Sequence, residues 1–505
     1  MADLRAFVAS LGDWRNADRG LARSLAAAIR DAVVDGRLPV GTTLPAERTL
    51  AAALELSRGT VVAGLALLRE DGWLRTRHGG GSVVLLPEHI VERTTPLSLD
   101  RWGDGRFLDM TVSVSSAPHH AYRRALERAA ERLPPLLVDS GLPTSGLPVL
   151  RELLAERYTA RGLPTRPEQI LITSGARSAL ALVLERFHDR RRSVVVENPT
   201  FHGALALVRR RRARLVGVPV TGDGWDVDRL TAAMRAPDTG LAYLTPDFHN
   251  PTGALMGERD RARLLSLTRA GAVMLVTDET MRDLDLRPSP TPPSHLGGPG
   301  TLIIGSTAKV LWSGLRVGWI RAGSAGWVRE LLLNPLQAQF SPPPLEQLIA
   351  HELLLDLERI LDERRARLRA QRDRLADLLA GTDAWTYTVP PGGLTLWLRL
   401  RHVFAENLAR RAGTHGLTLA TGPYFSADRG LSRHLRLPFT ASPELLDKAV
   451  AVLRTAHAEL RGHPDDPVRT AGAASSGLRT GTARPAVMSI GPGSAGGRRT
   501  VRRSR

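Results

Sequence analysis

The stretch GSTAKVLWSGLRVG, residues 305–318, contains the lysine from which the rest of the sequence can be interpreted. Of the 69 basic side chains in the chain, only Lys309 and Lys448 are lysines. A desolvated lysine can lose its proton and attack an aldehyde to form a Schiff base, whereas an arginine stays protonated. We therefore expect Lys309 to hold an aldehyde cofactor, with a surface lysine in a loop as the simpler alternative.

The residues on either side of Lys309 predict the end of a strand and a phosphate site. The apolar, β-branched run at 301–304 is typical of a buried strand, so the amine would lie just beyond that strand's carboxyl end. Ser306 offers a hydroxyl donor there, and Arg316 offers a two-pronged cation. Both groups suit a phosphate on the same ligand as the aldehyde.

Length and composition limit the classes of protein to consider. A chain of 505 residues is long enough for two or three domains. The absence of cysteine excludes disulfides, thiolate zinc sites and thiol catalysis, and we expect no metal site. Because there is neither a signal-peptide pattern nor a membrane-length apolar run, we expect a soluble, cytoplasmic protein with no membrane partner. The net charge of +18 points toward an acidic partner, although a GC-biased genome can also enrich arginine.

The first part of the chain predicts three helices in succession. Apolar residues recur at helical spacing over residues 18–35. A second, short helix is expected over 44–54 with Pro45 in its first turn. A third helix is expected over 58–71, with Ser57 as its N-cap.

The last two of these helices, and the residues after them, have a pattern that DNA-binding proteins use. Two short helices joined by a tight turn predict a helix-turn-helix, in which the start of the later helix reaches base edges in the major groove. Strands over 73–77 and 82–86, joined by His78 and three glycines, predict a hairpin wing whose basic tip can approach phosphates or the minor groove. A protein-docking module built from the same elements is the alternative.

Residues 44–82, LPAERTLAAALELSRGTVVAGLALLREDGWLRTRHGGGS, resemble the winged helix-turn-helix of the GntR family of bacterial regulators. The resemblance implies a domain over residues 18–86 that binds double-stranded DNA at a promoter operator. Some relatives carry a further arginine where this chain has Val62, which would remove one contact. The residues that the resemblance implies at the DNA surface are Arg48, Ser57, Arg58, Gly59, Thr60, Arg77, His78 and Gly79.

From residue 108 to about 460, short apolar runs alternate with amphipathic helices, which predicts an α/β fold with a mostly parallel sheet. In such sheets a ligand binds at the carboxyl ends of the strands. The chemically suitable residues that follow successive expected strands are Gly175, Ala176 and Arg177 after 170–173, Phe201 after 194–197, Asn250 after 241–245, Asp278 after 273–276 and Lys309 after 301–304.

Together these residue types describe a pyridoxal-phosphate site. The free N–H groups of a helix that starts near Gly175 suit the phosphate, and Phe201 offers a flat ring for stacking. Asn250 would donate to a ring oxygen, and the Asp278 carboxylate would keep the pyridine nitrogen protonated so that the ring can draw electrons from a substrate. Each signal has a simpler alternative, because Asp278 could cap a helix, Phe201 could belong to the core and Asn250 could lie in a plain turn.

Residues 108–461 resemble the fold-type I aminotransferases. The resemblance implies helices on both faces of the sheet and a small C-terminal α+β subdomain. It implies a Schiff base between Lys309 and pyridoxal 5'-phosphate, with Asp278 paired to the pyridine nitrogen. The other implied cofactor contacts are Gly175, Ala176, Arg177, Ser306 and Arg316 at the phosphate, Asn250 and Thr280 at the phenolic oxygen, and Phe201 on the ring. In HLRLPF, residues 434–439, Arg436 is implied to grip the ligand carboxylate, with a surface arginine as the alternative.

The chain departs from the aminotransferase pattern at two positions of the site. The family usually has a tyrosine where this chain has Thr280, and a threonine hydroxyl is shorter and less acidic. Arg177 stands where a glutamine is common and adds positive charge near the phosphate. Neither change removes the lysine, but both favour cofactor binding over efficient transamination.

The remaining segments complete the expected domain organisation. Residues 345–379 form a long amphipathic stretch that predicts one or two helices leading to the small subdomain, whose sheet would begin with 394–400. We expect an N-terminal extension over 1–17 and a linker over 87–107. The polar, arginine-containing residues 462–505 predict a disordered basic tail.

A winged helix followed by an aminotransferase-like domain resembles the MocR subfamily of GntR regulators. The resemblance implies a transcriptional regulator, usually a homodimer, that binds pyridoxal 5'-phosphate and senses the cofactor, an amino acid or an amine. Two alternatives remain at this point. One is a pyridoxal-phosphate-dependent aminotransferase with an accessory DNA-binding module. The other is a DNA-binding regulator whose cofactor domain is only a dimerisation scaffold. For the regulator that the resemblance implies, we expect at most residual transaminase activity.

Overall fold

The structure is a computed structural model, and part of the chain is described in it. Nearly all of the expected tail and of the expected linker lie outside the described residues, as do His78 and Gly79 of the expected wing. The described residues are 4–12, 14–15, 20–34, 37–38, 40–77, 81–85, 87, 108–138, 141, 143–269, 271, 273–288, 294–334 and 341–462.

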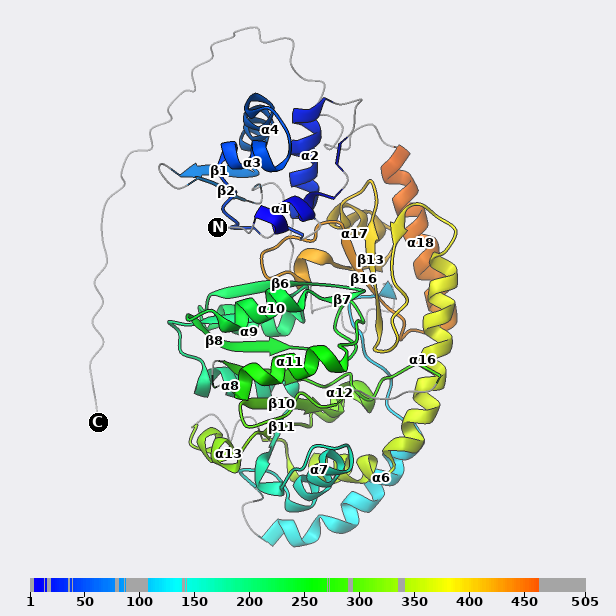
Figure 1. Ribbon diagram of the computed structural model, residues 1–505. Helices are drawn as coiled ribbons and strands as arrows, with labels where there is room; N and C mark the ends of the chain where they lie inside the picture. The colour runs from blue at the N-terminus through cyan, green and yellow to red at the C-terminus, as the bar shows by residue number, and fades with distance from the viewer. Residues whose placement is uncertain are drawn as a thin grey trace, which may run out of the picture. The chain divides into compact units, whose positions relative to one another are not determined.

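The N-terminal part consists of helices and a hairpin around one hydrophobic core (Figure 1). Buried side chains of this core include Phe7, Leu25, Leu50, Leu65 and Trp73. Because Phe7 lies on the first helix, part of the expected N-terminal extension belongs to this core. The elements are α1 (Leu4–Leu11), α2 (Leu21–Val34), α3 (Glu47–Ala53), α4 (Arg58–Glu70), β1 (Leu74–Arg77) and β2 (Gly81–Val84).

The second helix starts later than the sequence predicts. Pro45 was expected in its first turn, but α3 begins at Glu47. The preceding residues are extended because they pair with the hairpin: the amide of Leu44 donates to the carbonyl of Ser82 at 2.8 Å, and Thr43 forms a bridge with Val83. The predicted cap of the third helix is confirmed, since the Ser57 side chain accepts a hydrogen bond at the start of α4.

The larger domain is built on a mostly parallel sheet, as predicted. Within the described residues this sheet has eight strands in the order β4-β11-β10-β9-β8-β5-β6-β7. Neighbours from β10 to β6 pair in parallel, whereas β11 and β7 are antiparallel to their neighbours. The carboxyl ends of β5, β8, β9 and β10 therefore meet at one edge. The strands are β4 (Ile170–Thr173), β5 (Ser193–Asn198), β6 (Leu215–Thr221), β7 (Gly224–Trp225), β8 (Thr239–Leu244), β9 (Met274–Asp278), β10 (Thr301–Ser306) and β11 (Gly318–Ala322).

Helices cover both faces of this sheet (Figure 1). Successive side chains of β5 show the two faces, because Val194 and Val196 pack with α8 and α9 whereas Val195 packs with α10 and α11. The helices are α7 (Pro148–Ala160), α8 (Ala176–Phe187), α9 (His202–Arg210), α10 (Val227–Arg235), α11 (Glu258–Arg269), α12 (Thr307–Val310) and α13 (Ala325–Leu332), with the 3-10 turns η2 (Pro134–Val138), η3 (Pro167–Gln169) and η4 (Ser313–Leu315).

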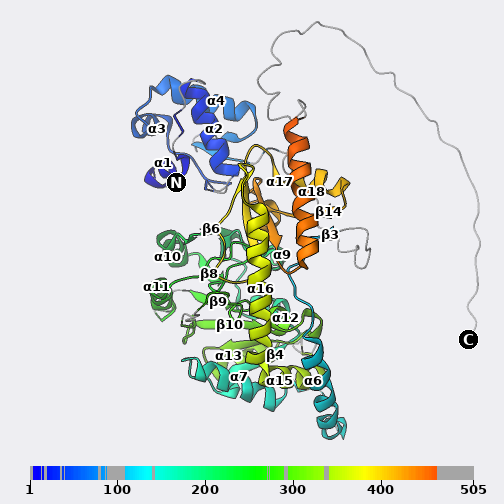
Figure 2. The ribbon, with the colours of Figure 1, turned by 90° about the vertical axis from the view of Figure 1, so that its right-hand side faces the viewer.

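A long helix leads from the larger domain to a small subdomain, as expected (Figure 2). The predicted stretch at 345–379 forms α15 (Pro344–Leu355) and α16 (Leu357–Leu379), with α6 (His119–Arg132) packed against α15. An antiparallel sheet of order β12-β13-β16-β15 forms the subdomain, beside the parallel pair β3–β14. Its elements are β3 (Leu108–Asp109), β12 (Trp385–Thr386), β13 (Thr395–Leu400), α17 (Ala405–Thr414), β14 (Leu417–Thr418), β15 (Ala420–Thr421), η5 (Gly422–Phe425), β16 (His434–Pro438) and α18 (Pro443–Gly462).

No single helix in the described part of the chain has the length and apolar character needed to cross a membrane. Helices α3 and α4 meet the criterion only when they are taken together across a bend of 117°. Both contribute buried side chains, such as Leu50 and Leu65, to the N-terminal core.

Candidate functional site

Lys309 lies in the short helix α12, just beyond the carboxyl end of β10 as predicted. The Ser306 hydroxyl caps this helix by accepting from the amide of Ala308 at 3.2 Å. The Lys309 amine donates to the carbonyl oxygen of Ser113 at 2.8 Å. Burial lowers the pKa of this amine to about 8, with a further contribution from the Arg436 cation. About a tenth of the amine is therefore uncharged and nucleophilic at pH 7, far more than for an ordinary lysine.

Asp278 is the last residue of β9 and lies opposite Ile304 in the register of β9 and β10. The hydroxyl of Tyr243 donates to its Oδ2 atom at 2.7 Å, and the amide of Thr280 donates to Oδ1 at 3.0 Å. Burial raises the pKa of Asp278, while hydrogen bonds from Thr280 and Tyr243 and the charge of Lys309 act in the opposite direction. The carboxylate is thus fixed in orientation near Lys309, and no ion pair to it is found among the described residues.

Tyr243 was not predicted from the sequence. It lies in the interior of β8, where an aromatic residue is typical of the core, and its side chain is fully buried. Burial and the neighbouring Asp278 both raise its pKa well above the ordinary value, so the phenol keeps its proton and acts as a donor. No signal in the sequence distinguishes it from an ordinary core tyrosine.

Thr280 belongs to the surroundings of Asp278. Its amide and side chain both hydrogen-bond that carboxylate. These contacts make Thr280 a residue that orients Asp278. Its role at the cofactor's phenolic oxygen stays a prediction.

The residues predicted to bind a phosphate lie where β4 leads into α8. Gly175 precedes α8 with a φ of +100°, a backbone conformation that favours glycine. Arg316 donates from Nη2 to the carbonyl of Ser174 at 3.0 Å, and its guanidinium carbon would lie 3.9 Å from a Cβ atom placed on Gly175. Arg177 is exposed in the first turn of α8. Two guanidinium groups therefore flank the helix start, as an anion site requires.

Ser306 has a different set of contacts from the one expected at a phosphate. Its hydroxyl donates to the carbonyl of Val317 at 3.1 Å while accepting from Ala308. The hydroxyl of Thr307 donates to the same carbonyl at 2.9 Å. These bonds join the end of β10 to the start of β11, so Ser306 holds the strand end that carries Lys309.

Aromatic rings lie beside the cations of the site. Phe201 lies at the start of α9, and a Cβ atom on Gly203 would approach its ring to 2.5 Å, so this position needs a glycine. His202 stacks on Tyr424 with ring centroids 4.3 Å apart. Burial, together with the cations of Arg436, Arg177 and Lys309, lowers the pKa of His202 to about 3.

His202 is therefore neutral, and it lies near three predicted site residues, Arg436, Arg177 and Lys309. It was not predicted from the sequence, although it directly follows Phe201. Its Nδ1 atom is buried and has no hydrogen-bond partner among the described residues.

Arg436, predicted to grip a carboxylate, lies buried on β16. Its Nη1 atom donates to Oδ1 of Asn250 at 3.4 Å, and its Nη2 atom donates to the carbonyl of Thr111. The guanidinium carbon lies 4.7 Å from the centre of the Phe425 ring. Burial lowers the pKa of Arg436 to about 10, so the group still carries its charge at neutral pH. Its Nε atom has no partner in the described part of the chain, which leaves a donor for a ligand.

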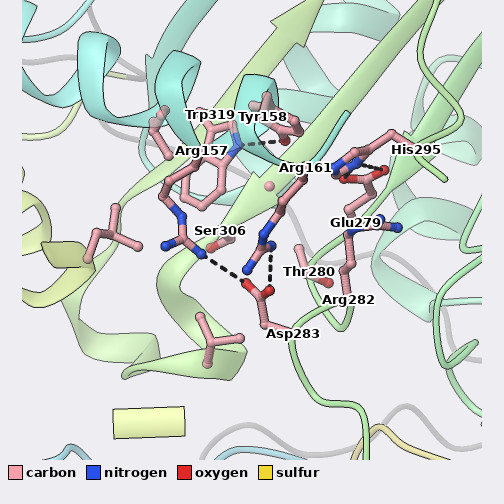
Figure 3. A pocket seen from close by; sticks show the side chains of 14 residues that line it. Arg157, Tyr158, Arg161, Glu279, Thr280, Arg282, Asp283, His295, Ser306 and Trp319 are labelled. Atoms are coloured by element: carbon pink, nitrogen blue, oxygen red, sulfur yellow. Dashed lines mark hydrogen bonds and ion pairs between the residues drawn. The ribbon is translucent and has the colours of Figure 1, made fainter. Parts of the chain in front are cut away.

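A small hollow adjoins Thr280 and Ser306 (Figure 3). Arg161 bonds Asp283 at 2.6 Å, and Arg157 approaches the same carboxylate at 3.9 Å. Other polar groups around it are also paired, such as Glu279 with His295 and Trp319 with Tyr158. Because these polar groups are paired with one another, we interpret the hollow as structural. Its contacts hold the segment that follows β9.

The predicted DNA-reading residues lie at the start of α4. The axes of α3 and α4 turn through 117°, as in a helix-turn-helix. The Ser57 side chain accepts from the amide of Thr60 at 3.0 Å, which fixes the first turn of α4. Arg58, Gly59 and Arg48 are exposed. The side chain of Arg77, with His78 and Gly79, lies outside the described residues.

Two family models match this chain. The model of aminotransferase class I and II matches residues 118–453. The model of bacterial regulatory proteins of the gntR family matches residues 21–84. The two matches cover the domain that contains Lys309 and the domain that contains α3 and α4.

Named relatives fall into two groups. The HTH-type transcriptional regulator YisV of Bacillus subtilis is 27% identical over 432 residues, which cover 79% of this chain and 88% of the relative. The probable rhizopine catabolism regulatory protein MocR of Rhizobium meliloti is 30% identical over 332 residues, which cover 61% and 66%. The 2-aminoadipate transaminase of Thermus thermophilus is 32% identical over 331 residues, which cover 62% and 81%.

Solved structures resemble the larger part of the chain. LysN, an alpha-aminoadipate aminotransferase of Thermus thermophilus complexed with N-(5'-phosphopyridoxyl)-L-leucine, is 28% identical with a TM-score of 0.65, covering 74% of this chain and 97% of that chain. The kynurenine aminotransferase of Pyrococcus horikoshii is 23% identical, also with a TM-score of 0.65, covering 73% and 98%. At that identity the second likeness shows the fold alone.

Proposed function

Because the chain belongs to the aminotransferase class I and II family and carries a gntR-family DNA-binding domain, we propose that it regulates transcription in response to pyridoxal 5'-phosphate and an amino compound. In this proposal the cofactor is bound covalently to Lys309. The protein acts as a cytoplasmic homodimer, and an amino acid or amine alters its binding to an operator.

The surroundings of Lys309 carry this proposal. Its amine has a pKa of about 8 and donates to a backbone carbonyl of Ser113. Nearby, the pKa of Asp278 is raised by burial, and a protonated pyridine nitrogen would offset that cost. Gly175 and Arg316 shape an anion site at the start of α8. These residues fit pyridoxal 5'-phosphate in charge and in hydrogen-bonding character.

The chain's own residues would divide the work at this site. When bound, the cofactor supplies an aldehyde that condenses with amines and a ring that withdraws electrons. Asp278, oriented by Tyr243, would hold the proton at the pyridine nitrogen. Arg316 and the N–H groups of α8 would bind the phosphate. Arg436 would bind a carboxylate on the amino compound, using donors that now contact backbone and Asn250.

The test is to locate the cofactor and measure its effect on DNA binding. Borohydride treatment of the loaded protein, followed by peptide mass spectrometry, should place the reduced adduct on Lys309. Lys309→Ala should lack the visible absorption band because the attacking amine is absent. In a mobility-shift assay it should still bind a promoter fragment that the unmodified protein binds, but pyridoxal 5'-phosphate should no longer change that binding.

Lys448→Ala is the matched control, because it removes the chain's other lysine. It should keep the absorption band and the response to the cofactor. The proposal would be wrong if no adduct formed on either lysine, or if the unmodified protein showed no absorption band. An unchanged DNA response in Lys309→Ala would favour a domain that serves only for dimerisation.

A second function has a specific observation in its favour. The similarity to 2-aminoadipate transaminase includes the region of Lys309, so the chain could catalyse transamination. Incubation of the loaded protein with 2-aminoadipate and a 2-oxo acid tests this directly. Repeated turnover would support an aminotransferase with an accessory DNA-binding domain, whereas at most a single conversion per protein would support the regulator.

A further inference from the structure

The segment of residues 110–116, between β3 and α6, lies against both groups expected to hold an amino compound. The carbonyl oxygen of Ser113 accepts from the Lys309 amine at 2.8 Å. The carbonyl oxygen of Thr111 accepts from the Arg436 guanidinium. Since one group would hold the cofactor and the other the ligand carboxylate, this segment is a wall of the ligand site.

Contacts at both ends keep this segment in place. Arg364 of α16 donates to the carbonyl of Ser116 at 2.8 Å and to the carbonyl of Lys309 at 3.4 Å. At the other end, Oδ1 of Asp109 accepts from the amide and the hydroxyl of Thr111 at 2.7 and 2.6 Å. The position of the segment relative to Lys309 is therefore fixed by hydrogen bonds to other elements.

Side chains of this segment alternate between solvent and the interior. Val112 and Ser116 are exposed, and Val114 is half-buried. Ser113 and Ser115 are only 4% and 5% exposed, so their hydroxyls face the interior. The Oγ atoms of both serines have no hydrogen-bond partner among the described residues.

Burying a polar group without a hydrogen bond costs free energy. Here two such hydroxyls lie two positions apart on the segment that contacts Lys309 and Arg436. A ligand that brings a hydrogen-bonding group to these serines would remove that cost. We infer that Ser113 and Ser115 form the side-chain subsite of the amino-compound site and select an amino acid with a polar side chain over its hydrocarbon isostere. This inference rests on the proposed function, because it concerns the ligand of the same site.

The test compares isosteric amino acids on the pyridoxal-phosphate-loaded protein. L-Serine is paired with L-2-aminobutyrate and L-homoserine with L-norvaline, so that each pair differs by a hydroxyl in place of a methyl group. Calorimetry and the change in visible absorption give each dissociation constant. The polar member of at least one pair should bind roughly tenfold more tightly, which corresponds to one net hydrogen bond.

Variants assign the preference to the two serines. Replacing both residues by alanine, Ser113→Ala with Ser115→Ala, should bring the members of that pair to within about twofold, because the hydroxyl partners are lost. Ser116→Ala is the matched control, since its side chain is exposed on the same segment, and it should keep the preference. Equal binding within both pairs by the unmodified protein, or a preference that survives the double variant, overturns the inference. Failure of every amine to bind would overturn the proposed function as well.

A second measurement is independent of any ligand. Removing a hydroxyl that lacks a partner should leave the thermal midpoint of the cofactor-free protein unchanged or raise it. A drop of several degrees in the double variant, with Ser116→Ala unchanged, would mean that these hydroxyls hold the fold together and would contradict the inference.

Discussion

The pKa of the Lys309 amine is lowered from 10.5 to about 8 because burial and Arg436 disfavour the ammonium form, while Asp278 acts against them. Only the uncharged amine attacks an aldehyde, so the rate at which cofactor-free protein takes up pyridoxal 5'-phosphate should rise with pH and level off above about 8. Below that value the rate should fall roughly tenfold per pH unit. Stopped-flow absorbance between pH 6 and 9.5 measures this profile.

The same profile in Arg436→Met checks the electrostatic cause. Removing this cation removes one of the two influences that lower the pKa, so the midpoint should move to higher pH. A profile that is flat over this pH range in the unmodified protein would contradict the perturbed pKa.

Individual residues of the site differed in how far the sequence could predict them. Lys309 and Asp278 follow apolar strands, and the rule that ligands bind at strand ends was enough to place both near one another. Tyr243 lies within a strand, where its contact with Asp278 depends on the pairing of β8 with β9. Ser113 precedes the lysine by 196 positions in a segment without periodicity. Contacts of that kind arise only from tertiary packing.

Among the elements, α4 depends on its first turn. Ser57→Ala removes the acceptor for the Thr60 amide and should lower the stability of the N-terminal domain by about 1 kcal/mol, measured by chemical unfolding followed by circular dichroism. Arg58→Ala should instead leave stability within about 0.5 kcal/mol and weaken DNA binding, because Arg58 is exposed. If both variants kept the DNA affinity of the unmodified protein, α4 would not be the DNA-reading helix.

Element types were predicted better than element ends. The strands around the site and the cap at Ser57 were found in the expected places, since hydrophobic period and capping are local properties. The start of the second helix was predicted too early, with Pro45 in its first turn, because the amide of Leu44 hydrogen-bonds the hairpin and keeps this segment extended. Helix α1 was missed as part of the core because Phe7 acquires its partners only when the later helices pack.

For the whole molecule, cofactor binding should stabilise the domain that contains Lys309 more than the N-terminal domain. At a pyridoxal 5'-phosphate concentration 100 times its dissociation constant, mass action contributes about 2.7 kcal/mol to the folded state. Calorimetry should show the transition of the domain containing Lys309 moving up by several degrees. Arg316→Ala should reduce the shift at the same concentration, because a phosphate ligand is lost, whereas Arg58→Ala should not. If the cofactor shifted the thermal transition equally in both variants, Arg316 would not be a phosphate ligand.

Helix α16 has 23 residues and is therefore about 35 Å long. Near its start, Arg364 holds the carbonyls of Ser116 and Lys309, and farther along Arg374 is bonded to Asp447 of α18. A rod of this length that turns by about 3° carries its far end nearly 2 Å sideways. A rigid helix of this length would act as a lever arm, so that a small adjustment beside the amine would reach the small subdomain as a movement large enough to repack side chains.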